Sequence, residues 1–199
     1  MRACRNRVRE YRLILDLEQR HLAAFREDLV ALAEAFTEIG SAPALRYIVG
    51  LRGRDARARV LAVLGRWEGR ARRVEMEDPA TAPEGQEIYF LLPLQRNPDP
   101  AGGPRKPLFT NEEMAELRFR LARKFHFRPE MVRVYGEWRN KASDLVPDHS
   151  FLIRIPRRSR GTVPALRRFL QRFILASPSW DQECLYLSDR WWGEFVYPN

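Results

Sequence analysis

"VREYRLILDLEQRHLAAFREDLVALAEAFTEI", residues 8–39, is the stretch on which the predicted fold depends. Its apolar residues recur at steps of three and four, and Glu18 is the only polar member of the series. The series comprises Val8, Tyr11, Leu15, Glu18, Leu22, Phe25, Leu29, Leu32, Phe36 and Ile39. Such spacing is typical of the a and d positions of a heptad, so it predicts one long helix of about 45–50 Å. Gly40 and the Ser-Ala-Pro that follows would end this helix.

The apolar face of this predicted helix is wider than a two-stranded coiled coil requires. Additional apolar side chains flank the heptad positions at Leu13, Ile14, Leu17 and Val30. Two interpretations remain open. The helix packs along its own protein, or it associates with a second copy of the chain through its heptad positions.

An arginine-rich segment follows over residues 44–73. Gly50 and Gly53 interrupt it, and apolar residues between Val60 and Trp67 then share one helical face. The arginines expected on the opposite face are Arg52, Arg59, Arg66, Arg70 and Arg73. We therefore predict that residues 1–75 form a helical arm that presents these guanidinium groups to a phosphate backbone. A helix-turn-helix is the weaker alternative, because its best register places Arg59 in the interior.

Residues 76–86 are predicted to link this arm to a second region. The sequence "MEDPATAPEGQE", residues 76–87, is acidic, contains proline and has no apolar period, which is typical of a linker or a long loop. A hairpin between "RRVEM" and the next strand is the alternative interpretation.

Residues 87–199 alternate between strand and helix patterns. Strands are predicted at 87–94, 131–135, 150–155, 183–187 and 191–197. One helix is predicted from a capping box of Thr110 and Glu113 to Phe125, and another over 163–176. The order is β-α-β-β-α-β with one extra C-terminal strand. It predicts an α+β fold in which the helical arm precedes a ferredoxin-like domain with an antiparallel sheet.

Residues 86–187 resemble a family of small, uncharacterised bacterial α+β domains. The resemblance rests on "QEIYF", "FTNEEMAELRFRLARKF", "VRVYGEWR", "HSFLIRI" and "QECLYL". Members of that family have a strand that ends in Gly-Gln-Trp-Arg, and Glu137 stands here in place of the glutamine. The resemblance implies the ferredoxin-like fold and no activity.

The sequence offers little evidence of an active site or of a metal site. His21, His126 and His149 are the only histidines, and no pair of them has the spacing of metal ligands. Cys4 and Cys184 are too few for a disulfide framework. Nucleophile-elbow, phosphate-binding glycine-rich and zinc-protease motifs are absent from the sequence. We therefore predict a protein that is not an enzyme and has no metal or cofactor.

The composition predicts a globular protein with an acidic partner. The chain of 199 residues is 45% hydrophobic and 31% charged, with a net charge of +9 that 32 arginines and 3 lysines supply. Coding bias toward arginine is the alternative explanation for that charge. No signal peptide or membrane span is apparent, so we expect a cytoplasmic protein without a membrane partner.

Nucleic acid, either RNA or DNA, is the predicted partner. A second basic run comprises Arg157, Arg158, Arg160, Arg167, Arg168 and Arg172. The aromatic residues that could stack bases or anchor an interface are Tyr89, Tyr135, Trp138, Tyr186, Trp191 and Trp192. We predict an accessory subunit of a larger assembly that binds nucleic acid through these arginines. The alternatives are a structural subunit that makes only protein contacts, and an enzyme of unknown class.

Overall fold

The computed structural model describes residues 7–40, 44–77, 87–95, 107–140, 142–178, 180, 182–189 and 191–199. The chain forms two compact units. The first unit comprises Met1–Glu84, Val134–Asp148 and Trp191–Gly193, and the second comprises Gly85–Arg133, His149–Arg190 and Glu194–Asn199. Most of the predicted linker, residues 78–86, lies outside the described residues.

The first element of the chain is a strand. β1 (Arg7–Leu17) alternates buried side chains such as Leu13 and Leu15 with half-buried ones such as Arg12 and Ile14. This period of two is the strand pattern, and it accounts for Leu13, which the heptad leaves out. β1 pairs antiparallel with β3 on one side and with β4 on the other, so neighbouring strands bind its backbone groups on both edges.

The predicted long helix over 8–39 is therefore wrong. Glu18 has extended backbone angles, and the helix that follows, α1 (Gln19–Leu32), has only fourteen residues. Ala33 is extended again, and β2 (Ala35–Ile39) completes the stretch. The apolar residues of the predicted heptad are thus divided among a strand, a helix and a second strand. Each element buries its own apolar side chains, with a period of two in the strands and of about 3.6 in the helix. A coiled coil through these heptad positions is excluded, since no continuous helix carries them.

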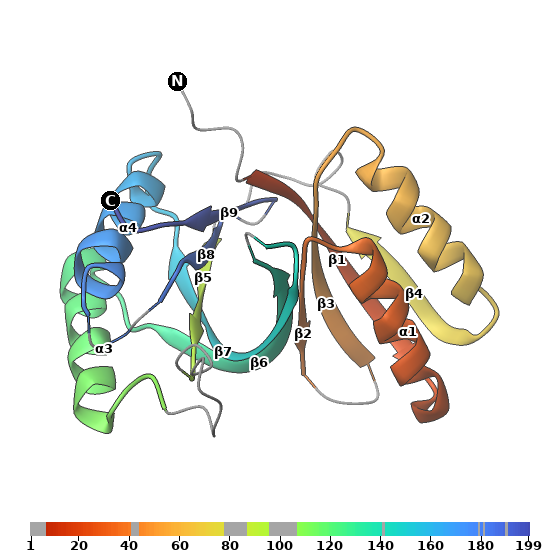
Figure 1. The fold of residues 1–199 in the computed structure, drawn as a ribbon, viewed down its shortest axis with the longest axis horizontal. Helices are drawn as coiled ribbons and strands as arrows, with labels where there is room; N and C mark the ends of the chain where they lie inside the picture. Colours follow the sequence, from red (N-terminus) through yellow and green to blue (C-terminus); the bar gives the residue numbers. More distant parts are fainter. Residues whose placement is uncertain are drawn as a thin grey trace. The chain divides into compact units, whose positions relative to one another are not determined.

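The first unit continues as β3 (Ala44–Leu51), α2 (Ala56–Trp67) and β4 (Ala71–Glu77). Its strands follow the order β4-β1-β3-β2, and β2 also pairs with the part of β6 that belongs to this unit. The helical arm predicted for residues 1–75 is thus a sheet with two helices (Figure 1).

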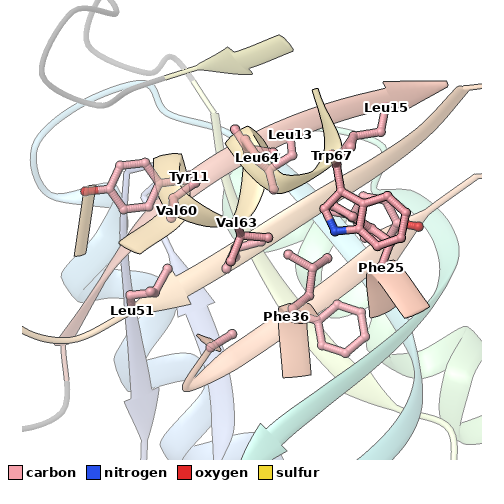
Figure 2. Close-up of a cluster of buried hydrophobic side chains, with 14 of the residues drawn as sticks. Tyr11, Leu13, Leu15, Phe25, Phe36, Leu51, Val60, Val63, Leu64 and Trp67 are labelled. Carbon is pink, nitrogen blue, oxygen red and sulfur yellow. The ribbon is translucent and has the colours of Figure 1, made fainter. Parts of the chain in front are cut away.

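The core of the first unit lies between its two helices and its sheet (Figure 2). Phe25 of α1 contacts Tyr47 of β3 and Trp67 of α2, with ring centroids 5.3 and 5.6 Å apart. Val60, Val63 and Leu64 bring the inner face of α2 into the same core. Buried apolar area of this kind is the main source of stability in a domain of this size.

The second unit has the same order of elements. It contains β5 (Glu87–Pro93), α3 (Asn111–Phe125), β6 (Glu130–Arg139), β7 (Leu145–Pro156), α4 (Thr162–Phe169), the π-helical turn η1 (Leu170–Leu175), β8 (Leu185–Ser188) and β9 (Trp192–Val196). The strands β6, β7 and β9 each have residues in both units. Both halves of the chain therefore read β-α-β-β-α-β, and the strand orders β4-β1-β3-β2 and β8-β5-β7-β6 correspond position by position.

The individual elements predicted for residues 87–199 are confirmed. α3 begins with the predicted capping box, in which the Thr110 hydroxyl accepts a hydrogen bond from the Glu113 amide and the Glu113 carboxylate accepts one from the Thr110 amide. Alternate residues of β5, such as Ile88 and Phe90, are buried with Leu117 of α3 in the core of the second unit.

The predicted fold class is nevertheless wrong. Hydrogen-bonded strands follow the order β3-β2-β6-β7-β5-β8-β9-β1-β4, with a further pairing between β3 and β1. This arrangement replaces the predicted long helix and separate ferredoxin-like domain. The prediction fails because residues 7–17 form strand β1, in which the buried Tyr11 and Leu15 also have heptad spacing.

Candidate nucleic-acid interface

Arg59, which was predicted to face a phosphate backbone, binds the protein's own backbone. Its guanidinium donates hydrogen bonds to the Leu32 carbonyl over 2.8 Å and to the Arg52 carbonyl over 3.4 Å. Leu32 is the last residue of α1, where carbonyl groups lack partners within the helix and carry partial negative charge. Arg59 therefore acts as a C-terminal cap for α1.

Three other arginines that were predicted to share this helical face also contact side chains of the protein. The guanidinium of Arg66 lies 2.9 Å from the Asp28 carboxylate, and Arg70 stacks over Trp67 with 5.6 Å to the ring centroid. Arg73 is on β4 and pairs with Glu75 at 2.8 Å. Because α2 ends at Trp67, these residues occupy a helix, a turn and a strand, and they do not form one helical stripe. Arg52 precedes α2 and is exposed.

In the second basic run, too, some arginines bind groups of the protein itself and others are exposed. Arg158 donates to the carbonyl of His126, the left-handed residue that ends α3, over 2.8 Å. Arg167 forms an ion pair with Glu194. Arg160, Arg168 and Arg172 are exposed, and Arg157 is half-buried. At least two members of this run therefore stabilise the fold.

Of the six predicted aromatics, Trp192 is the most exposed. Tyr89, Tyr186 and Trp191 are buried, and Tyr135 and Trp138 are half-buried, whereas Trp192 is 43% exposed. Trp191 and Trp192 alternate between inside and outside because they enter a strand, β9, in which side chains point to opposite faces. The Glu10 amide donates to the Trp191 carbonyl over 2.9 Å, which places this end of β9 beside β1.

Two arginines of β1 lie over the exposed indole ring. The guanidinium carbons of Arg7 and Arg9 are 5.4 and 5.6 Å from the centroid of Trp192, within the range of cation–π attraction. A third arginine, Arg12, lies 5.9 Å from the centroid of Trp191. All of these residues belong to the first unit. We call Arg7, Arg9 and Trp192 the arginine–tryptophan cluster.

The chemistry of this cluster suits a phosphate and a base. The Nε atom of Arg9 is buried and has no hydrogen-bond partner within the described part of the chain, so it is a donor without an acceptor. A guanidinium held against an indole face still presents N–H groups along its edges, where phosphate oxygens bind. The exposed indole offers a surface on which an unpaired base stacks.

Arg7 and Arg9 are not among the residues predicted from the sequence to bind nucleic acid. Both precede or interrupt the heptad positions, so the helix interpretation gave them no common direction. The signal that identifies them is the two-residue spacing, which puts Arg7 and Arg9 on one face of a strand. Their proximity to Trp192 could not be predicted, because it joins residues at opposite ends of the chain.

The described part of the chain contains no cluster of three or more histidine, cysteine, aspartate or glutamate side chains that could hold a metal ion. None of the helices found there is long and apolar enough to cross a membrane.

No family model and no curated protein matches the chain. Two solved structures are similar to it. One is Thermus thermophilus Cse3 bound to an RNA that represents a pre-cleavage complex, at 20% identity, with 90% of this chain and 99% of that chain covered and a TM-score of 0.37. The other is the CRISPR endoribonuclease Cse3 bound to a 19-nucleotide RNA, at 18% identity, with the same coverage and a TM-score of 0.35.

The prediction that this chain is not an enzyme is contradicted by the comparison, because Cse3 is an endoribonuclease. Cse3 is bound to RNA in both structures. The resemblance of residues 86–187 to a bacterial family stays a prediction, since no family model matches.

Proposed function

We propose that this protein binds single-stranded nucleic acid, RNA or DNA, through the arginine–tryptophan cluster. The observation that supports this most strongly is the placement of Arg7 and Arg9 over the exposed ring of Trp192. Proteins that bind single strands combine cations that follow the backbone with aromatic rings on which bases stack. The cluster supplies both within one face of β1 and the adjacent start of β9.

The cluster is better suited to this role than the arginines of α2. Arg59 and Arg66 are held by the Leu32 carbonyl and the Asp28 carboxylate, so a phosphate would have to compete with these partners. The guanidinium groups of Arg7 and Arg9 instead lie over an aromatic ring, and the buried Nε of Arg9 has no hydrogen-bond partner within the described residues.

The salt dependence of binding tests this proposal. Fluorescence anisotropy of a labelled twelve-nucleotide RNA, and of the same sequence as DNA, is measured at several salt concentrations. Each neutralised phosphate contributes about 0.7 to the salt slope on a single strand, so Arg7→Ala/Arg9→Ala should lower the slope by about 1.4. The difference between the two oligonucleotides identifies the preferred nucleic acid.

The matched control is Arg52→Ala/Arg72→Ala, which removes the same charge from two exposed positions of the first unit. This control should keep the slope of the parent. Equal slopes for both double variants would contradict the proposal, because long-range attraction by net charge would then account for binding.

A protein-binding subunit is the second candidate function. Phe119, on α3, is 61% exposed, the highest value among the exposed large apolar side chains of the described residues. Aromatic side chains are enriched in protein interfaces, so this ring is a candidate contact for a protein partner. Self-association through a heptad helix over residues 8–39 is not possible, because that segment forms β1, α1 and β2.

A further inference from the structure

The side chain of Phe119 points away from the core of the second unit. Leu117 and Leu121 form the buried face of α3, and at 3.6 residues per turn Phe119 lies on the opposite side. The adjacent positions on that outer side are Ala115 and Ala122, which are small. The outer face of α3 therefore carries one exposed aromatic ring with small residues on one side of it.

Charges of opposite sign stand on either side of that ring. Glu112 and Glu116 precede Phe119 on this face, and Arg123 follows it. Glu112 and Arg123 have no ion pair within the described ranges, whereas Glu116 pairs with Arg120 along the helix. The first half of the outer face is thus acidic and the second half is basic.

We propose that the outer face of α3 docks against α3 of a second copy of this chain, with the helices antiparallel and the two Phe119 rings at the two-fold axis. In a two-fold interface, residue i of one copy meets residue j of the other, and the reverse contact also forms. Glu116 lies three residues before Phe119, about 4.5 Å along the axis, and Arg123 lies four residues after it, about 6 Å. Antiparallel packing therefore puts Glu116 level with the partner's Arg123, twice in each pair.

The charge pattern favours a second copy over other occupants. A nucleic acid would meet the carboxylates of Glu112 and Glu116 as well as the arginines, and so would a uniformly acidic protein. The same chain turned by a two-fold rotation places acid against base at both ends. Antiparallel helices also bring the positive end of each helix dipole near the negative end of the other.

The expected association is weak. A single helix pair buries less area than the roughly 1,200 Å² of a stable interface, so the dimer should form only at high protein concentration. Its attraction between charges should weaken as salt is added, because exposed pairs are screened.

Sedimentation equilibrium with charge-reversed variants tests the proposal. The parent should dimerise with increasing concentration, and Phe119→Ser should remain monomeric. Glu116→Arg and Arg123→Glu should each be monomeric alone, because each places like charges opposite one another. An equimolar mixture of these two variants should form a heterodimer, since every facing pair is then of opposite sign.

Leu61→Ser is the control, because it removes a different exposed apolar side chain, on α2 of the first unit, and should leave association unchanged. Circular dichroism of each variant verifies folding. A parent that stays monomeric at all concentrations would overturn the proposal, as would single variants that associate like the parent. Weaker oligonucleotide binding by Phe119→Ser, with a monomeric parent, would assign the face to nucleic acid instead.

Discussion

The guanidinium of Arg59 donates a hydrogen bond to the carbonyl oxygen of Leu32 over 2.8 Å, at the end of α1. A second arginine, Arg139, reaches the carbonyl of Val30 at 3.4 Å in the same last turn. α1 has no basic residue of its own in that turn, so these two side chains supply the positive charge that the end of the helix favours. Part of the arginine content of this protein therefore stabilises its own helices.

Arg59→Ala should lower the free energy of unfolding by about 1 kcal/mol, because a charge-assisted bond to the helix end is lost. Arg52→Ala removes an exposed guanidinium from the same region and should change it by less than about 0.5 kcal/mol. Urea denaturation of both variants measures the difference. Equal stability of the two would show that Arg59 does not cap α1.

Asp28 joins α1 to α2. Its carboxylate accepts a hydrogen bond from the indole nitrogen of Trp67 over 2.7 Å and pairs with Arg66 at 2.9 Å. Asp28→Ala should destabilise the protein by about 1–3 kcal/mol, because the buried indole N–H loses its acceptor. Arg66→Ala should cost less than about 1 kcal/mol, since only an exposed ion pair is removed. Thermal unfolding that ranks the two variants in the opposite order would refute this assignment.

Tyr135 should ionise at unusually high pH. Burial and the hydrogen bond that its hydroxyl donates to Glu137 over 2.7 Å raise the pKa of Tyr135 from 10.0 to about 12. Between pH 10 and 12 the unfolded state loses this proton and the folded state keeps it, so the free energy of unfolding should fall as pH rises through that window. Ultraviolet absorbance titration measures the pKa. Glu137→Gln should lower it, and a titration near pH 10 in the parent would contradict the account.

Leu29→Ala should lower the free energy of unfolding by about 2–5 kcal/mol, because the Leu29 side chain is fully buried in the core of the first unit. Leu61→Ala makes the same change at a position that is 40% exposed on α2, and it should cost less than about 1 kcal/mol. Denaturant midpoints of the two variants provide the comparison. Similar losses would mean that the burial of Leu29 is not what stabilises α1.

Local sequence signals identified the elements of the second half well. The capping box of Thr110 and Glu113 lies within four residues, so the start of α3 could be predicted without knowledge of the fold. The heptad spacing also predicted the burial of Leu29, although it assigned Leu29 to a longer helix. The prediction holds for this residue because Phe25 and Leu29 lie one turn apart on the buried face of the shorter α1.

The remaining errors come from contacts that are distant in sequence. Tyr11 and Leu15 fit both a heptad and a strand, and the choice depends on pairing with β3 and β4, which no local pattern encodes. The partner of Arg66 is 38 residues away, and Trp192 meets Arg7 from the other end of the chain. Arginine spacing alone could therefore not distinguish a structural guanidinium from one that is available to a ligand.

Quenching of tryptophan fluorescence by an unlabelled twelve-nucleotide single strand tests the central claim most directly. Trp192 is the most exposed of the predicted aromatics, and a base stacked on its ring should quench its emission. The matched variant is Trp192→Leu, which retains an apolar side chain but removes the aromatic surface. The account predicts saturable quenching in the parent, and affinity lower by about 1–3 kcal/mol with little quenching in the variant. Equal quenching and equal affinity in the two proteins would contradict it.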